Sequence, residues 1–226
     1  ETNMVVQHNM AASNANRQLG ISTNTLSKST EKLSSGYRIN RAADDAAGLS
    51  ISEKMRSQIR GLNKASSNAQ DGISAIQTAE GALNEAHSIL QRMNELATQS
   101  ANDTNTTADR TAVQSEVNAL TNELSRIAST SQFNTQNLLD GTFTGKNLQV
   151  GALENQKITI SIGTMNAKAL GVDSLDVKSF TKAGSAMTLI QKAISKVSGQ
   201  RSDLGALQNR LEHTVNNLRS EEHTSE

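Results

Sequence analysis

The 226-residue sequence contains no cysteine and no proline, and aromatic residues make up only 2% of it. Without cysteine, the chain has no disulfide, no thiol nucleophile and no thiolate ligand for a metal. Without proline, nothing in the sequence forces a break in a long helix. With so few aromatic residues, the core must consist of Leu, Ile, Val, Met and Ala, which favours slender helix-on-helix packing.

The charges balance, with 22 basic and 22 acidic residues. A net charge of zero gives no general attraction to phosphate groups, so we expect no nucleic-acid partner. No stretch approaches the roughly 18 apolar residues that cross a bilayer, so we expect no membrane partner. The start shows no basic end followed by an apolar run, so we expect secretion without a cleaved signal peptide.

Catalytic patterns are also lacking. The sequence contains neither a G-x-S-x-G nor an H-E-x-x-H string, and its four histidines are scattered without metal-ligand spacing. We therefore expect no enzyme activity, no cofactor and no metal site.

The first segment has a seven-residue repeat of small or apolar residues: Val5, Ala12, Leu19, Leu26 and Leu33. This spacing keeps the repeated side chains on one narrow seam of a helix. The neighbouring seam positions are mostly Ser, Asn and Thr, so the helix is weak by itself. We predict that this self-assembly seam requires partner helices.

Two further helices are predicted in the next part of the chain. One starts at Asp44, because acidic residues favour the first turn, and its apolar residues step by threes and fours to Leu96. About 50 such residues make a rod of roughly 75 Å. Its glycines, among them Gly61, Gly72 and Gly81, predict bends or close contacts. After a polar turn from Ser100 to Thr107, a third helix folds back antiparallel.

The pattern changes again from about Ser131. Ile158, Ile160 and Ile162 alternate with polar residues, which predicts a small β segment at about 131–177. A last helix starts near Ser185 and has a heptad repeat that stops at Leu218. We interpret 219–226 as a probable non-native tail. The predicted fold is mainly α with a small β part, an elongated antiparallel coiled-coil helical bundle.

Four strings identify a family resemblance: Lys32–Ser52, Ser67–Ala86, Gln91–Thr104 and Gln200–Leu218. Together they resemble the amino- and carboxyl-terminal halves of bacterial flagellin, the subunit of the flagellar filament. The resemblance extends from Met4 to Leu218. It implies that 4–43 form the amino-terminal half of the inner domain and that 44–218 form the rod domain.

The resemblance also implies what this chain lacks. The variable outer domains of longer flagellins are replaced by a short connection, Gly163–Gly184. In flagellins a final helix pairs with the first segment. No part of this sequence up to residue 226 resembles that helix, so we expect this chain to polymerise poorly.

Function follows from the same resemblance. It implies an extracellular structural subunit for swimming motility, exported by the flagellar type III apparatus. The implied partners are other flagellin subunits, an export chaperone, the filament cap and the host Toll-like receptor 5. The implied receptor-binding residues are Gln91, Arg92, Glu95, Leu96, Gln99, Val113 and Glu116.

The spacing of Arg92 and Leu96 leaves two interpretations open. Residues four apart share a helix face, so an exposed Arg beside an exposed Leu suits an interface. Alternatively, Leu96 continues the apolar stripe from Met93 and Arg92 is a solvated charge. The family resemblance favours the surface role.

Two other functions remain as alternatives. A chemoreceptor-type signalling coiled coil is also a helical rod with few aromatic residues, but it has a membrane span and lacks an alternating segment such as Lys157–Ile162. A hook–filament junction protein is a flagellin relative. The strings around Arg38 and Leu204 fit the filament subunit better.

Overall fold

The computed structural model describes residues 10–35 and 46–225, in two compact units, Glu1–Ser57 and Gln58–Glu226. The first unit holds α1 (Met10–Ser35) and the start of α2 (Ala46–Ser100). The second continues with α3 (Thr107–Thr130), β1 (Gln132–Phe133), β2 (Gln136–Asn137), β3 (Lys146–Gln149), β4 (Lys157–Ile160), α4 (Ala167–Leu170) and α5 (Phe180–Ser225). The units divide inside α2, later than the expected boundary at residue 44. The expected helix start at Asp44 lies outside the described residues.

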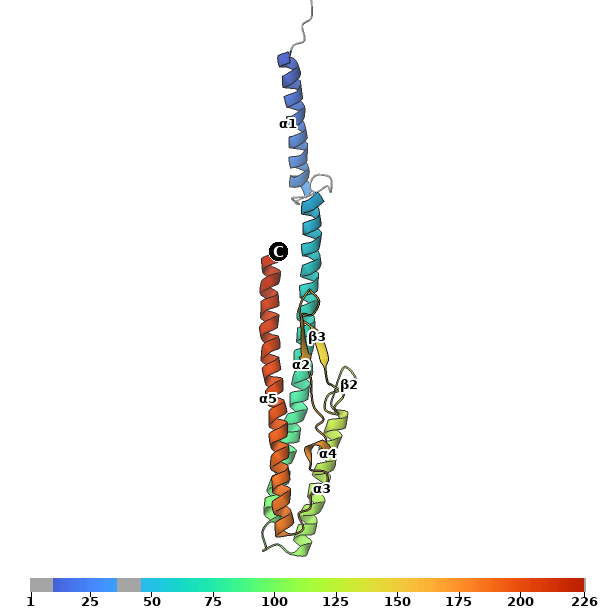
Figure 1. Cartoon of the computed structure of the whole chain (residues 1–226), viewed down its shortest axis with the longest axis vertical. Helices are drawn as coiled ribbons and strands as arrows, with labels where there is room; N and C mark the ends of the chain where they lie inside the picture. The colour runs from blue at the N-terminus through green and yellow to red at the C-terminus, as the bar shows by residue number, and fades with distance from the viewer. Residues whose placement is uncertain (1–9, 36–45, 226) are drawn as a thin grey trace, which may run out of the picture. The chain divides into compact units, whose positions relative to one another are not determined.

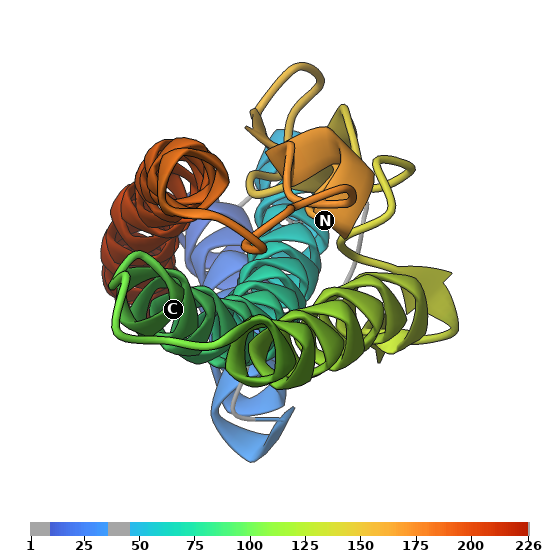
Figure 2. The same cartoon turned by 90° about the horizontal axis from the view of Figure 1, so that it is seen from below.

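The predicted fold class is confirmed: helices predominate, and the described strands form two small antiparallel sheets. In the second unit, α3 and α5 both run antiparallel to α2 (Figure 1). Seen end-on, α3 and α5 lie on different sides of α2, and α4 with the neighbouring loops closes the space between them (Figure 2). One hydrophobic core therefore joins all three long helices with the β segment.

The buried face of α2 consists mainly of small residues. From Leu62 onward, side chains three or four apart are buried, and many of them are alanines: Ala65, Ala69, Ala75, Ala79, Ala86 and Ala97. The predicted stripe is confirmed for this part of the helix. Earlier positions of the stripe differ, since Ile51 and Met55 are 60% and 41% exposed.

Gly72 is one of the close contacts that the sequence predicted. A Cβ atom added to it would lie 2.2 Å from Cδ1 of Leu148 and 3.2 Å from Cδ1 of Leu211. A side chain here would clash with Leu148 of β3 and would crowd Leu211 of α5. Gly81 has no such neighbour within 4 Å, so there the prediction of a close contact is wrong.

The β segment contains the predicted strands and one hairpin that the sequence did not predict. Leu148 of β3 pairs with Ile158 of β4, and Ile158, Ile160 and Ile162 are buried. The additional hairpin joins β1 to β2 through Asn134 and Thr135, both of which have positive φ. Two successive residues with positive φ suit the twist of a tight hairpin.

α5 begins five residues before the expected Ser185, at Phe180. Ser179 caps it, because its hydroxyl oxygen accepts a hydrogen bond from the backbone N–H of Lys182 at 3.2 Å. The heptad residues Ile190, Val197, Leu204, Leu211 and Leu218 are all buried, as predicted. The helix continues to Ser225, but Leu218 is its last buried residue. The interpretation of 219–226 as a non-native tail stays a prediction.

The segment expected to be a connection is instead largely packed into the core. Within residues 163–179, here called the strap, the buried side chains are Met165, Ala167, Leu170, Val172, Leu175 and Val177. Side chains of the long helices form hydrogen bonds with its backbone. Ser100 donates to the carbonyl of Val177 at 2.5 Å, and Lys196 donates to that of Ala169 at 2.8 Å.

Gln114 of α3 is another buried side chain that binds the strap, at 8% exposed. Its amide nitrogen donates to the carbonyl of Leu175 at 2.8 Å, and its amide oxygen accepts from the N–H of Val177 at 2.8 Å. The side chain therefore acts as a neighbouring strand would. It satisfies two backbone groups that water cannot readily reach.

We predict that Gln114→Ala lowers the free energy of unfolding by about 2 kcal/mol, because it leaves buried polar groups without partners. Urea unfolding followed by circular dichroism measures the change. Ser115→Ala, at the exposed neighbouring position, is the matched control, and its effect should stay within about 0.5 kcal/mol. Equal effects of the two substitutions would contradict the anchoring role.

Candidate functional site

Arg92 joins α2 to α3 at an exposed surface. Its Nε and Nη2 donate to Oε1 of Glu116 at 3.2 and 2.9 Å, and its Nη1 donates to Oε2 of Glu95 at 3.2 Å. About half of each of the Arg92 and Glu116 side chains is accessible to solvent. These three residues form a charged cluster that spans two helices.

The buried side chains beneath this cluster bring the two helices together. Met93 and Leu96 of α2 and Val113 and Val117 of α3 belong to the hydrophobic core. Their burial sets the distance and rotation of the helices. As a result Glu116, which is 24 residues from Arg92 in the sequence, faces it directly.

The expectation that Leu96 is exposed is wrong. Leu96 is 1% exposed and Val113 is 6% exposed, so both lie in the core. Four residues on a helix correspond to a rotation of about 40°. In a stripe this narrow, that rotation is enough to move a side chain from the rim, where Arg92 lies, to the interior. For Leu96, the apolar-stripe interpretation was correct.

The other residues of the predicted receptor site lie on the surface. Gln91, Glu95 and Gln99 are exposed on the same side of α2 as Arg92. Nε2 of Gln91 lies 3.0 Å from Nε2 of His87, and the Gln99 carbonyl accepts a hydrogen bond from Asn105. The structure thus brings five of the seven predicted residues to one surface and places two beneath it.

The electrostatics of the cluster suit recognition more than stability. The hydrogen bond that Arg92 donates to Glu116, followed by the one it donates to Glu95, raises the pKa of Arg92 above its ordinary value. The guanidinium stays charged at every physiological pH. Because the groups are exposed, the ion pairs contribute little to folding. Their charges remain available to a partner.

A capped turn holds the end of the cluster in place. Thr106 caps α3: its hydroxyl accepts from the backbone N–H of Asp109, and Asp109 accepts from the backbone N–H of Thr106 at 2.8 Å. Arg110 donates to the carbonyls of Ser100 and Asn102. These bonds fix how α3 leaves the turn, and therefore where Glu116 lies.

A second candidate surface lies on α1. Ala12 is exposed there, and Leu19, Leu26 and Leu33 are 65%, 68% and 85% exposed. Val5, the first residue of the predicted seam, lies outside the described residues. The described seam residues thus present apolar side chains to solvent.

In the described ranges, no group of three or more His, Asp or Glu side chains could hold a metal ion. Among the described helices, none is both long and apolar enough to traverse a bilayer.

We predict that acidification weakens the turn through Asp109. Hydrogen bonds from Thr106, above all from its backbone N–H, lower the pKa of Asp109. A lowered pKa in the folded state stabilises the fold above the unfolded Asp pKa of about 4, and this stabilisation is lost as the pH falls through the folded-state pKa. Asp109→Asn should therefore flatten the fall in stability between about pH 5 and 2, as measured by urea unfolding at several pH values.

Asp203→Asn, at an exposed position within α5, is the control and should retain the unmodified pH dependence. An unchanged pH profile for Asp109→Asn would show that the capping carboxylate does not contribute.

Comparison with known proteins is consistent across the chain. Residues 6–144 match the family described as the bacterial flagellin N-terminal helical region, and residues 187–225 match the bacterial flagellin C-terminal helical region. The charged cluster lies within the first match. The second match continues past Leu218 and includes most of the segment interpreted as a non-native tail.

Individual proteins give the same result. The chain is 54% identical to the flagellin of Halalkalibacterium halodurans over 95% of its own length and 80% of that protein, and 47% identical to the flagellin of Bacillus subtilis over 95% and 82%. Among solved structures, it resembles the crystal structure of Bacillus cereus flagellin with a TM-score of 0.59 and 32% identity, over 67% of this chain and 88% of that one.

Proposed function

The chain belongs to the bacterial flagellin family and is a structural filament subunit rather than an enzyme, and we propose that it assembles with copies of itself into a filament for swimming motility. The observation that carries this proposal is the exposed heptad seam of α1. Leu26 and Leu33 together expose large apolar surfaces on one side of the helix.

The physical argument rests on the hydrophobic effect. Burial of a leucine side chain contributes about 1.5–3 kcal/mol relative to exposure in water. A seam with a leucine at every seventh position gains this free energy when partner helices cover it. Because the neighbouring seam positions are mostly polar, the apolar surface of one helix is too small to stabilise it without partner helices.

We predict that the double variant Leu26→Ser, Leu33→Ser weakens self-association at least about tenfold. Each substitution removes more than about 1.4 kcal/mol of the free energy gained when partner helices bury the leucine side chain. Sedimentation velocity over a range of chain concentrations measures the association. Ile21→Ser is the matched control, since Ile21 is 55% exposed but lies off the heptad seam. Unchanged association of the double variant would reject the seam as an assembly surface.

Export and localisation form part of the same proposal. Filaments lie outside the cell, so the chain must leave it. We propose export by the flagellar type III apparatus without a cleaved signal peptide, with help from an export chaperone and with addition under a filament cap. Family membership supports each of these partners.

We further propose that Toll-like receptor 5 recognises the charged cluster on α2 and α3. Arg92, Glu95 and Glu116 supply both signs of charge on a rigid, two-helix surface. Gln91 and Gln99 extend it with amide groups. Leu96 and Val113 support the surface from below and do not themselves reach a partner.

We expect Arg92→Ala and Glu116→Ala each to weaken receptor binding about tenfold or more, because each removes an exposed charge at the centre of the surface. Surface plasmon resonance with the receptor ectodomain measures the affinity, beside a cellular signalling assay. Arg126→Ala is the control, because Arg126 forms a similar ion pair with Glu123 farther along α3. Unaltered binding of both variants would remove the receptor assignment and leave the filament assignment intact.

The two alternatives have less support. A chemoreceptor-type coiled coil is not what either family match describes. A hook–filament junction protein shares a flagellar origin, but the relatives with about half of their residues identical are flagellins and filament core proteins.

A further inference from the structure

The chain has only three phenylalanines, and two of them line one pocket of the second unit. These are Phe133 and Phe143. The third, Phe180, is 60% exposed at the start of α5. An exposed phenylalanine and a pocket lined by two others raise the question of whether Phe180 can occupy such a pocket.

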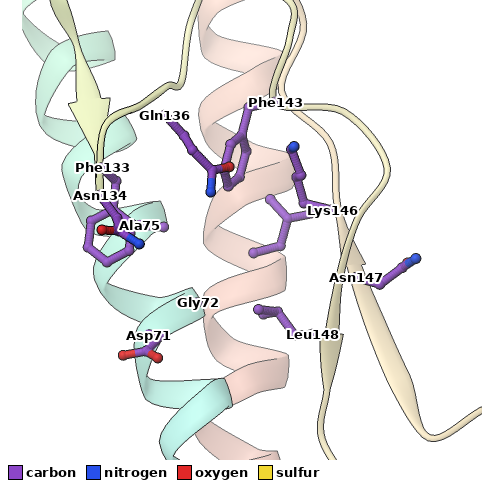
Figure 3. Close-up of a pocket in the computed structure, with 11 residues that line it drawn as sticks. Asp71, Gly72, Ala75, Phe133, Asn134, Gln136, Phe143, Lys146, Asn147 and Leu148 are labelled. Atoms are coloured by element: carbon purple, nitrogen blue, oxygen red, sulfur yellow. The ribbon is translucent and has the colours of Figure 1, made fainter.

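The pocket has a volume of about 480 Å³ and lies between α2 and the β segment. In Figure 3, Phe133 lies on one side and Phe143 with Lys146 on the other, while Leu148 faces Gly72 on α2. Ala75 and Ile160 complete its apolar lining. At Gly72 the side chain of Leu148 packs against the backbone of α2.

The lining also contains charges of both signs. Asp71 lies at one edge, and Nζ of Lys146 lies 5.9 Å from the centroid of the Phe143 ring. A cation at this distance interacts favourably with an aromatic face. The pocket therefore suits an aromatic side chain that is flanked by charged groups.

Phe180 is held at a fixed place on the bundle. It directly follows the capping Ser179. The nearby Val177 accepts a hydrogen bond from the Ser100 hydroxyl and donates one to the amide oxygen of Gln114. Residues Lys178 and Lys182 flank it, and Lys182 pairs with Asp176 at 2.9 Å. Two lysines therefore lie within two residues of the exposed Phe180 in the sequence.

Phe180 cannot reach the pocket of its own chain. Its neighbour Val177 is bonded to Ser100, whereas the pocket lies beside Gly72, which is 28 residues earlier on α2. That separation corresponds to about 42 Å of helix. Any contact between Phe180 and the pocket must therefore join two molecules.

We propose that Phe180 of one copy inserts into the pocket formed by Phe133 and Phe143 of a second copy. This inference rests on the proposed self-assembly. Phenylalanine rings favour edge-to-face or offset contacts with other rings, and the basic residues beside Phe180 suit Asp71 at the pocket edge. The contact joins two different surfaces, so it can repeat without closing. It sets a stagger of about 40 Å between neighbouring bundles.

A single aromatic side chain buries about 150–250 Å². Stable interfaces bury more than about 1,000 Å². Phe180 is therefore the anchor of a broader contact between bundles, in the way that a few buried aromatic residues dominate many interfaces.

The first experiment compares Phe180→Ala with Leu189→Ala in the full chain by sedimentation velocity. Both residues are exposed on α5, at 60% and 40%, so neither substitution should alter the circular dichroism spectrum. Phe180→Ala should weaken self-association about tenfold, as expected for loss of an aromatic anchor. Leu189→Ala should weaken it much less.

The second experiment uses the absence of cysteine in the chain. One tagged chain carries Phe180→Cys and a differently tagged chain carries Gln136→Cys, at an exposed position in the pocket lining. Oxidation of the mixture should give mainly the mixed disulfide. The pair Leu189→Cys with Gln136→Cys should give far less.

The outcomes separate this inference from the proposed function. If the unmodified chain associates but Phe180→Ala has no effect, or the mixed disulfide does not exceed the control, the contact is wrong and self-assembly stands. The unmodified chain is expected to associate weakly, and a complete absence of association at every concentration would contradict both.

Discussion

The packing of α2 against α5 and the β segment in one hydrophobic core is the constraint on which the rest of the second unit depends. Half of the buried residues of α2 are Ala or Gly, and the side chains of Leu148 and Leu211 pack against Gly72. Small residues bury little surface each, so a long helix is needed to gather enough. The third side of the core is then filled by α3, the β segment and the strap. Among the described residues, the core contains one buried aromatic residue, Phe143, so most of its apolar surface comes from aliphatic side chains spread along the helices.

The periodic part of this architecture could be predicted from the sequence, because a long stripe leaves a repeated signal. The stripe of α2 from Leu62 and the heptad of α5 to Leu218 are both buried as expected. The β1–β2 hairpin has two-residue strands, which are too short to show alternation. The strap has no period either, since single side chains such as Gln114 from other helices determine its course. Its packing is a tertiary property that no local pattern encodes.

In the candidate site, too, the burial of a single residue depends on tertiary packing that the local sequence pattern does not show. The sequence places Arg92 and Leu96 on one helix and about 40° apart. Whether that rotation crosses from surface to core depends on where α3 lies, and its position is set by buried contacts of Val113 and Val117. Likewise, the pocket between Phe133 and Phe143 combines segments that only the fold brings together. The exposure of Phe180 has no sequence signal, because an aromatic residue is ordinarily expected inside.

Flagellin must hold a stable bundle while it keeps surfaces for partners, and this structure separates the two tasks. Stability rests on the buried aliphatic side chains, each of which contributes about 1 kcal/mol or more. The charged cluster around Arg92 and the seam of α1 are exposed, and exposed ion pairs contribute about 0–1 kcal/mol. A surface residue can therefore change without loss of the fold. Conversely, Leu96 and Val113 are buried, so a change in either would lower stability and would disturb the surface above them only through the helix positions.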